Sequence, residues 1–530
     1  MKLRLTGTFT RSASFELDIP DIYERELPFT VTLNGEKVLE TRANVFSLYH
    51  LLPDTEYTVS AEDGERLTFR TRTESVLLNV RRFGAKGDGK NDDTACLQAA
   101  IMACPKDGTV YVPAGVYCTG PLFCRSYQTI YLDRGAVLLG KTDRNAYPVL
   151  PGMTRGTDEA GELPLGTWEG NPLDCFASLI TLIGVTDTDI TGEGVLDGNA
   201  QNADWWENTK KRRIAWRPNM IYMQRCARVR VQGLTIRNSP SWTVHPCYSE
   251  DLTFVNLLII NPPDSPNTDG FDPESCGNVQ LLGSRISVGD DCIAIKSGKY
   301  YMAVYHLKPC TGIVIRNCLF ERGHGSVTIG SEIAGGVRDV FVSKCLFIGT
   351  DRGIRLKTRR GRGKSSVLTG LTFQDIRMRK VSMPFTINMF YFCDPDGHTA
   401  YVQDQNFHPA DEWTPKIGTL LFRNITCTDV DASLVAAAGL PENPIGEIRM
   451  EQIRASFLPV SEQVPLVPLM MDNYPKVAGR GILIRNAEKV ILRDVEVTGS
   501  TDTAPVLESV GEACAEQVRF TDEFAEPNSR

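Results

Sequence analysis

Long apolar runs are missing from this sequence: no stretch of about 18 apolar residues occurs, so no membrane-spanning helix is predicted. The first residues, Met1–Gly7, lack the apolar run of a secretion signal. A basic excess is missing too, because 57 lysines and arginines stand against 65 aspartates and glutamates, a formal net charge of −8. Nucleic-acid binders usually show the opposite balance. These absences predict a cytoplasmic protein with no membrane or nucleic-acid partner.

Paired cysteine motifs are also missing. The 15 cysteines are an odd number and show neither C-x-x-C pairs nor metal-finger spacing. Several of them, such as Cys318 and Cys345, lie in apolar, strand-like runs. Free cysteine is usually a small buried hydrophobic residue. The cysteines therefore predict buried, reduced thiols, in keeping with a cytoplasmic location.

Residues 1–78 alternate polar and apolar side chains, which is typical of short strands. Asn34-Gly35 between two such runs is a strong hairpin signal. The run Leu52–Val59, with Tyr57 inside it, resembles the tyrosine corner of fibronectin type III domains. We therefore expect a small fibronectin-like β-sandwich at 1–78, followed by a second domain at 79–530.

The second domain opens with a run rich in glycine and acidic residues, Phe83–Thr94, before an alanine-rich segment, Ala95–Ala103. This segment is predicted to be a helix, capped by Asn91, Asp92 or Asp93. A calcium-binding loop is the alternative, although the run lacks the spacing and closing glutamate of an EF-hand.

From about residue 179 the sequence repeats. The strand-like run Val231–Asn238 is followed 23 positions later by Phe254–Asn261, and similar runs recur to the end of the chain. Intervals of roughly 23–35 residues indicate coils that must stack, because no single coil can bury its own apolar face. The predicted fold is all-β, a right-handed parallel β-helix. A β-propeller is the alternative, but its blades need four strands and roughly 40–50 residues each.

Four polar patches interrupt these strands at intervals of about one coil. If each patch lies at the same point of successive coils, the four stack into one site. The patches are Asn267-Thr268-Asp269-Gly270, Gly289-Asp290-Asp291-Cys292, Gly323-His324-Gly325-Ser326 and Arg355-Leu356-Lys357.

The patches carry residues suited to acid–base chemistry. Close carboxylates such as Asp269, Asp290 and Asp291 raise the pKa of at least one of them, so one can donate a proton while another accepts one. Hydrolysis of a glycosidic bond needs that pair of roles. Arg355 and Lys357 flank Leu356 and would share one strand face, where two cations suit an anionic ligand. Taken singly, the aspartates could equally be ordinary turn residues.

The four patches, in this order, resemble the signature motifs of the polygalacturonases, glycoside hydrolase family 28. Leu356 departs from the isoleucine usual in the family. The resemblance covers roughly residues 79–500. Further segments that resemble the family are Gly192–Gly198, Trp205-Trp206 and Asn238–His245.

The resemblance implies hydrolysis of α-1,4 bonds between galacturonic acid units with inversion, without a metal or cofactor. Asp290 would be the general acid, Asp269 and Asp291 would activate water, and His324 would support the acid and the sugar. Inversion implies carboxyl groups roughly 6.5–9.5 Å apart. The implied substrate-binding residues are Asn267, Arg355, Lys357, Tyr391 and Arg352.

Three long segments are expected to close one end of the cleft, as in some exo-acting members of this family: Lys141–Cys175, Lys299–Thr311 and Cys393–Trp413. We therefore expect an exo-polygalacturonase acting on pectin-derived oligogalacturonides from the non-reducing end. Further cations could grip the terminal sugar, and the candidates are Arg217, Arg359, Arg360 and Arg362.

Several alternatives stay open. They are an endo-polygalacturonase, a rhamnogalacturonan or xylogalacturonan hydrolase, a pectate lyase that uses calcium and an arginine base, and a non-catalytic carbohydrate-binding β-helix. The sequence does not indicate an oligomeric state.

Overall fold

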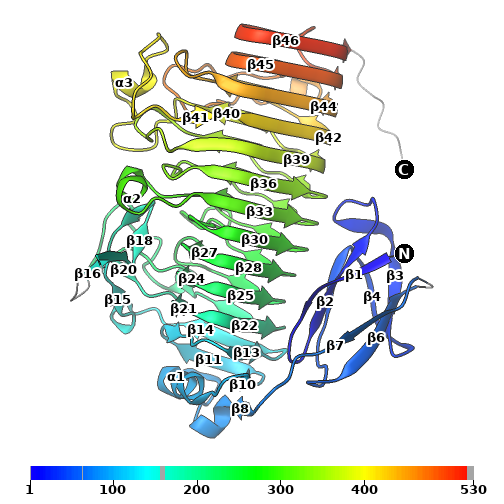
Figure 1. The fold of residues 1–530 in the computed structure, drawn as a ribbon, viewed down its shortest axis with the longest axis vertical. Coiled ribbons are helices and arrows are strands. Elements are labelled where there is room, and N and C mark those ends of the chain that lie inside the picture. Colours follow the sequence, from blue (N-terminus) through cyan, green and yellow to red (C-terminus); the bar gives the residue numbers. More distant parts are fainter. Residues whose placement is uncertain (1, 63, 156–160, 522–530) are drawn as a thin grey trace.

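The computed structural model describes residues 2–62, 64–155 and 161–521, which form a small antiparallel part beside a long solenoid (Figure 1). No helix in these ranges combines the length and the apolar character needed to cross a membrane. The small part has two sheets around an aromatic core that includes Phe15, Phe29, Phe46 and Phe69. One sheet holds β1 (Lys2–Thr8), β2 (Ala13–Asp18) and β5 (Val45–Leu48); the other holds β3 (Glu24–Leu33), β4 (Glu36–Ala43), β6 (Glu56–Ala61) and β7 (Leu67–Arg70).

The solenoid consists of three series of parallel strands, and from Val367 on one long strand per coil takes the place of the first two series. The first series is β8 (Leu77–Asn79), β10 (Gly108–Val112), β13 (Gln128–Leu132), β22 (Thr186–Gly192), β25 (Ala227–Gln232), β28 (Glu250–Val255), β30 (Gly277–Leu282), β33 (Cys310–Arg316), β36 (Val337–Ser343), β39 (Val367–Arg379), β42 (Thr419–Val430), β44 (Ile445–Phe457), β45 (Arg480–Thr498) and β46 (Val506–Thr521). Since β8 already pairs with β10, the solenoid begins just before residue 79.

The other two series complete each coil. The second is β9 (Asp88–Asp92), β11 (Gly115–Thr119), β14 (Ala136–Gly140), β23 (Val195–Asp197), β26 (Thr235–Arg237), β29 (Leu258–Ile260), β31 (Arg285–Ser287), β34 (Leu319–Glu321) and β37 (Leu346–Ile348). The third is β12 (Leu122–Phe123), β21 (Ile180–Ile183), β24 (Ile221–Gln224), β27 (Val244–Cys247), β32 (Ala294–Ile295), β35 (Val327–Ile329), β38 (Arg352–Lys357), β40 (Met383–Asn388) and β43 (Ser433–Ala438).

The core is a ladder of equivalent side chains. Val231 pairs with Phe254, which confirms the offset of 23 residues seen in the sequence. The same rung continues with Leu281, Ile315 and Val342, all of them buried. Burying one such side chain contributes about 1.5–3 kcal/mol, and each coil can bury its own only against the next. The parallel pairing confirms the β-helix and excludes the propeller.

The predicted helix is α1 (Thr94–Ala103), at the start of the solenoid (Figure 1). Asp93 occupies its N-cap position, but its carboxylate accepts the backbone N–H groups of Lys86 and Gly87, at 2.6 and 2.9 Å. Asp92 instead accepts the N–H of Thr94, at 3.0 Å. The predicted cap is confirmed: Asp93 is the N-cap residue by position, while Asp92 makes the side-chain bond because the preceding loop uses the carboxylate of Asp93.

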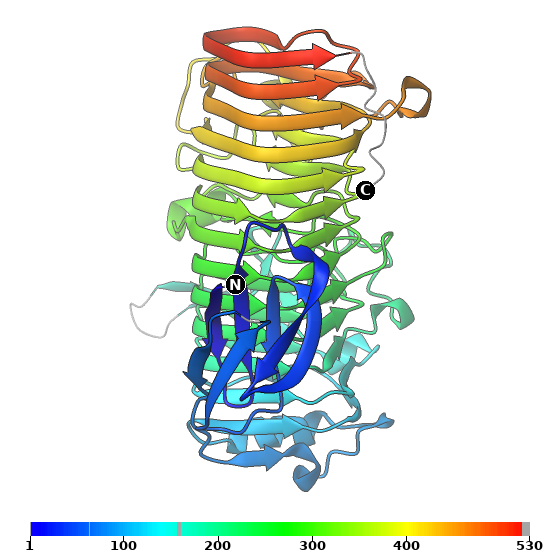
Figure 2. The ribbon, with the colours of Figure 1, turned by 90° about the vertical axis from the view of Figure 1, so that its right-hand side faces the viewer.

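The sandwich lies against the first strand series of the solenoid (Figure 2). Glu16 forms two hydrogen bonds, of 2.6 and 2.7 Å, with the guanidinium of Arg316. The side chain of Tyr49 lies over Gly233, where any Cβ atom would overlap its hydroxyl group. A partly buried ion pair and the close approach of Tyr49 to the backbone of Gly233 therefore fix the two parts to each other.

Two glycine substitutions test this docking. Gly233 and Gly184 both have positive φ, +78° and +63°, but a Cβ atom at Gly184 would meet nothing within 4 Å. Alanine at either position costs roughly 1–2 kcal/mol for the left-handed backbone. Gly233→Ala must also displace Tyr49 and the carbonyl of Gly192, which the Cβ atom would overlap, an overpacking cost of about 1–3 kcal/mol. We expect Gly233→Ala to lower the Tm more than Gly184→Ala; equal losses in thermal unfolding would contradict this packing.

Candidate active site

The third strand series brings the polar patches together. Phe271 pairs with Ile293 on the next coil, which sets Asp269 level with Asp291. Asp291 in turn pairs with Gly325, where a Cβ atom would approach the carboxylate of Asp291 to 2.7 Å. The glycine next to His324 is thus needed because an acid lies against the backbone. The predicted stacking of the patches on successive coils is confirmed.

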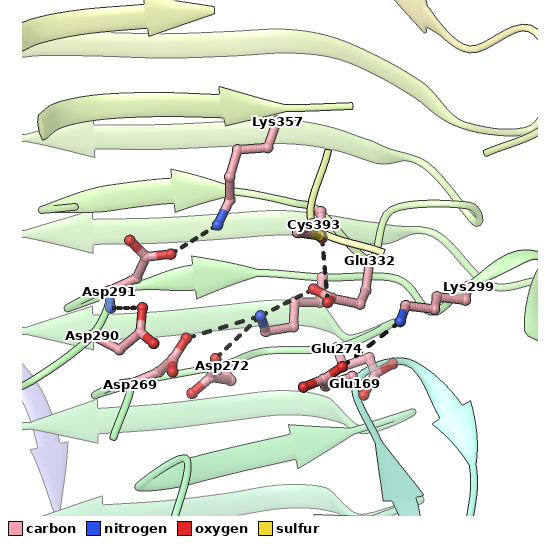
Figure 3. Close-up of polar contacts among 12 residues, drawn as sticks. Glu169, Asp269, Asp272, Glu274, Asp290, Asp291, Lys299, Glu332, Lys357 and Cys393 are labelled. Atoms are coloured by element: carbon pink, nitrogen blue, oxygen red, sulfur yellow. Dashed lines mark hydrogen bonds and ion pairs between the residues drawn. The ribbon is translucent and has the colours of Figure 1, made fainter. Parts of the chain in front are cut away.

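Three carboxylates meet at this point (Figure 3). One oxygen of each of Asp269, Asp290 and Asp291 lies within 4.8 Å of the others. The nearest oxygens are therefore closer than the roughly 6.5–9.5 Å expected between the carboxyls of an inverting pair. The reason is that the turn directs both Asp290 and Asp291 into the cleft while the coil register adds Asp269.

Asp291 is held by two cations from the coils that follow. Its carboxylate lies 3.0 Å from Nζ of Lys357 and 3.2 Å from a guanidinium nitrogen of Arg355. Leu356 between them is buried in the core, as the strand alternation predicts. Burial alone would raise the pKa of Asp291, but Lys357 and Arg355 outweigh it and hold that pKa well below its usual range. Asp291 is therefore ionised.

The other two acids hold protons more tightly. Burial and the charge of Asp291 raise the pKa of Asp290, against the opposing effect of His324. Burial and the charge of Asp290 raise the pKa of Asp269 well above its usual value. Oδ1 of Asp269 has no hydrogen-bond partner among the described residues. One ionised acid beside two acids with raised pKa is the arrangement that acid–base catalysis requires.

His324 pairs with an acid that the sequence reading missed. Its Nδ1 lies 2.7 Å from a carboxylate oxygen of Asp351, and its backbone N–H donates to the carbonyl of Asp290. The hydrogen bond with Asp351 raises the pKa of His324, with burial opposing and Asp290 assisting. The coil register could have identified Asp351. The backbone N–H of Ser326 donates to the carbonyl of Arg352 on the next coil, and this sets Asp351 beside His324.

Tyr391 lies under the two cations. Its ring centre is 5.7 Å from Cζ of Arg355 and 5.3 Å from Nζ of Lys357. The resemblance to the family implied that Tyr391 binds substrate, and the structure places its ring beside Arg355 and Lys357. Its predicted contact with a sugar stays a prediction.

Arg352 is used differently from its prediction as a substrate-binding residue. Its guanidinium donates to the backbone carbonyls of Val467 and Pro468, at 2.9 and 3.3 Å. That segment places the sulfur of Met470 2.9 Å from Arg355. These contacts favour a role for Arg352 in holding the segment over the cations rather than in touching a sugar.

Asn267 lies at the opposite side of the acids. It has φ +55°, and its side-chain oxygen accepts a 2.6 Å hydrogen bond from Arg217. Arg217 is buried and its guanidinium lies 5.2 Å from the ring centre of Trp168. Burial lowers the pKa of Arg217 to about 10. The other predicted gripping cations are occupied: Arg359 and Arg362 pair with Asp394, and Arg360 pairs with Glu442.

An imidazole titration tests the pairing of His324. Because Asp351 stabilises the protonated ring, Asp351→Asn should lower the pKa of His324. NMR of histidine-labelled protein can follow this shift, and the other five histidines serve as an internal reference. An unchanged pKa of His324 in the variant would show that the two side chains are not coupled.

Comparisons with known proteins agree with this geometry. A "Probable polygalacturonase" of Vitis vinifera is 32% identical over 394 residues, which cover 72% of this chain and 75% of that protein. An "Exo-poly-alpha-D-galacturonosidase" of Dickeya chrysanthemi is 25% identical, covering 74% of this chain and 69% of the relative. The solved family 28 exopolygalacturonase of Yersinia enterocolitica shares the fold, with a TM-score of 0.68, 20% identity and coverage of 99% and 97% of the two chains. Residues 156–453 match the family model described as glycosyl hydrolases family 28, and the chain belongs to that family.

Proposed function

We propose that the chain is a polygalacturonase that hydrolyses α-1,4-linked galacturonic acid from the non-reducing end, with inversion. The observation that carries the hydrolysis is the pairing of Asp291 with Arg355 and Lys357 beside two acids of raised pKa. Arg355 and Lys357 carry two positive charges against the single charge of Asp291. A substrate whose sugars carry carboxylates suits such a pair of cations.

Asp290, whose pKa is raised, gives its proton to the glycosidic oxygen, and the bond from that oxygen to the anomeric carbon breaks. A water molecule attacks the same carbon from the other side and loses a proton to Asp269, which must be in its ionised form for this step. Asp291 stays ionised and orients the water. Arg355 and Lys357 bind the uronate carboxylate, and Tyr391 forms the floor beneath them. His324, charged through Asp351, stabilises the ionised form of Asp290 after the proton has left.

Contacts among the three insertions support exo action. Within the described residues, Lys299 donates its backbone N–H to the carbonyl of Gly170, at 2.8 Å, and its Nζ lies 2.9 Å from Asp394. The rings of Tyr300, in α2 (Tyr300–Tyr305), and Trp413 stack with centres 4.1 Å apart. Segments from all three predicted insertions thus meet at one end; residues 156–160 of the first lie outside the described ranges.

The insertions line a pocket that is open to solvent. It has a volume of about 560 Å³, and its lining includes Trp168, Trp216, Lys299, Asp394 and His398. Trp168 also contacts Arg217, which binds Asn267 beside the acids, so the cavity adjoins the site. A pocket of this size beside the acids supports binding of a sugar there, and aromatic rings suit the apolar faces of sugars.

Two further proposals concern the chain as a whole. In the sandwich, the N–H of Leu52 bonds to the hydroxyl group of Tyr57 at 2.9 Å, which supports a fibronectin type III-like module. All 15 cysteines are free thiols, and most are buried, which supports a reducing, cytoplasmic location. The substrate there would be a pectin-derived oligogalacturonide.

Removal of the acid tests the mechanism. Asp290→Asn cannot protonate the leaving oxygen, so kcat on oligogalacturonides should fall by about 10²-fold or more. The control is Asp264→Asn, which changes an exposed aspartate near the same cleft and should leave kcat unchanged. An Asp290→Asn variant with wild-type kcat would rule out this residue as the acid.

The products tell exo from endo action. With saturated tri- to hexagalacturonates, we expect short products of one size from the earliest time points and no mid-chain fragments. Mid-chain cleavage of the hexamer would overturn the exo proposal. The same assay run in a chelator tests the lyase alternative: hydrolysis should continue unchanged, whereas lost activity together with an ultraviolet-absorbing product would indicate a calcium-dependent lyase.

A further inference from the structure

A buried lysine outside the four patches lies at the centre of the acidic cluster. Lys296 follows Ile293 and Ile295, which face the core, so its side chain leaves the opposite face of the strand. Its Nζ is 3.2 Å from Glu332, 3.7 Å from Asp272 and 4.0 Å from Asp269. The side chain is only 5% exposed. One cation is thus shared by three carboxylates, Asp269, Asp272 and Glu332, which Figure 3 labels.

An indole ring fixes the position of this lysine. Nζ of Lys296 lies 4.2 Å from the ring centre of Trp242, a distance typical of a cation–π contact. Trp242 is itself buried and stacks on Trp168, with ring centres 6.4 Å apart. The ammonium group is therefore confined between the indole and the acids, and it cannot swing to solvent.

The acids around Lys296 differ in how many hydrogen bonds their carboxylate oxygens accept. Glu332 accepts a hydrogen bond from Lys296 at 3.2 Å. Both oxygens of Asp272 and one oxygen of Asp269 lack a hydrogen-bond partner among the described residues. A buried carboxylate without donors must take up a proton unless a nearby cation keeps it ionised. Lys296 is the nearest cation to both aspartates, so it decides how easily they ionise.

We propose that Lys296, held by Glu332 and Trp242, is a positioning residue that sets the ionisation of the base Asp269. The inference rests on the proposed hydrolysis, because the base role of Asp269 belongs to that function. The two patch cations, Arg355 and Lys357, contact Asp291, whereas Lys296 contacts Asp269. Lys296 opposes burial and the neighbouring acids, which raise the pKa of Asp269, so its removal would make Asp269 harder to ionise.

The electrostatics around these groups agree with the geometry. Burial alone would lower the pKa of Lys296, but Glu332 and Asp269 outweigh it and hold that pKa well above its usual range. Burial alone would raise the pKa of Glu332, but Lys296 and Lys299 lower it to about 2. The charged groups that face Asp269 are Asp272, Asp290, Asp291, Lys296 and Arg217.

Two variants should shift the pH profile in opposite directions. Lys296→Met removes the cation, raises the pKa of Asp269 and moves the acidic limb of kcat/KM to higher pH. One pH unit below the wild-type midpoint, kcat/KM should fall by a further factor of about 10 or more. Glu332→Gln removes a competing carboxylate, so the acidic limb should move to lower pH. A structural role alone would lower activity without moving the limb.

A surface lysine provides the control. Lys308→Met removes a cation that pairs with Glu250 at 2.8 Å on the outside of the solenoid, and the limb should stay in place. The inference is overturned if the acidic limb of the kcat/KM profile lies at the wild-type pH in both Lys296→Met and Glu332→Gln. If the wild type does not hydrolyse oligogalacturonides, the proposed function fails and the inference is tested by stability instead.

The stability test needs no substrate. In Lys296→Met the folded-state pKa of Asp269 lies further above its unfolded value, so the extra stability from protonation is present at low pH and is lost as pH rises through the folded pKa. The Tm difference between wild type and Lys296→Met should therefore grow from pH 4 to pH 7. A Tm difference independent of pH would show that Lys296 does not control a carboxyl group here.

Discussion

Burial of negative charge is the constraint on which this site depends. Three aspartates lie within 4.8 Å of one another in a largely buried place, and they repel one another. The fold answers with cations: Arg355 and Lys357 hold Asp291 ionised, and Lys296 lies among the remaining carboxylates. What results is a set of acids with unequal proton affinities. That inequality, rather than the number of acids, is what lets one donate a proton while another accepts one.

The solenoid can supply this arrangement because its coils share one register. A residue on one coil meets its counterpart on the next, so the acids come from two coils. Arg355 and Lys357 come from a later coil, and Lys296 lies on the coil of Asp291. Core side chains such as Ile293 and Leu356 point to the inside of the same coils. They fix the position of each polar neighbour along the axis of the solenoid. The three insertions contact one another, because Lys299 of one bonds to Gly170 and pairs with Asp394 of the other two.

Much of this could be predicted from the sequence, since a solenoid repeats. The offset between Val231 and Phe254 predicts the length of one coil, and the order of the four patches predicts which residues form the site. Contacts with segments distant along the chain could not be predicted in this way: Met470 reaches Arg355 from 115 residues away. Lys296 was missed because it stands alone in an apolar strand, although the alternation after Ile293 already turns it outward. The cations that seemed free for a sugar, such as Arg360, proved to be buried with their own partners.

The closeness of the acids makes the stereochemistry of the reaction the decisive observation. A spacing this short could also serve a carboxylate nucleophile. In the present account no carboxylate is free for that role, because two cations hold Asp291 and Asp269 acts on water. The direct test is ¹H NMR of the first product released from an α-1,4-linked oligogalacturonide. The account predicts that the new reducing end appears first as the β-anomer; an α-anomer formed first would contradict it.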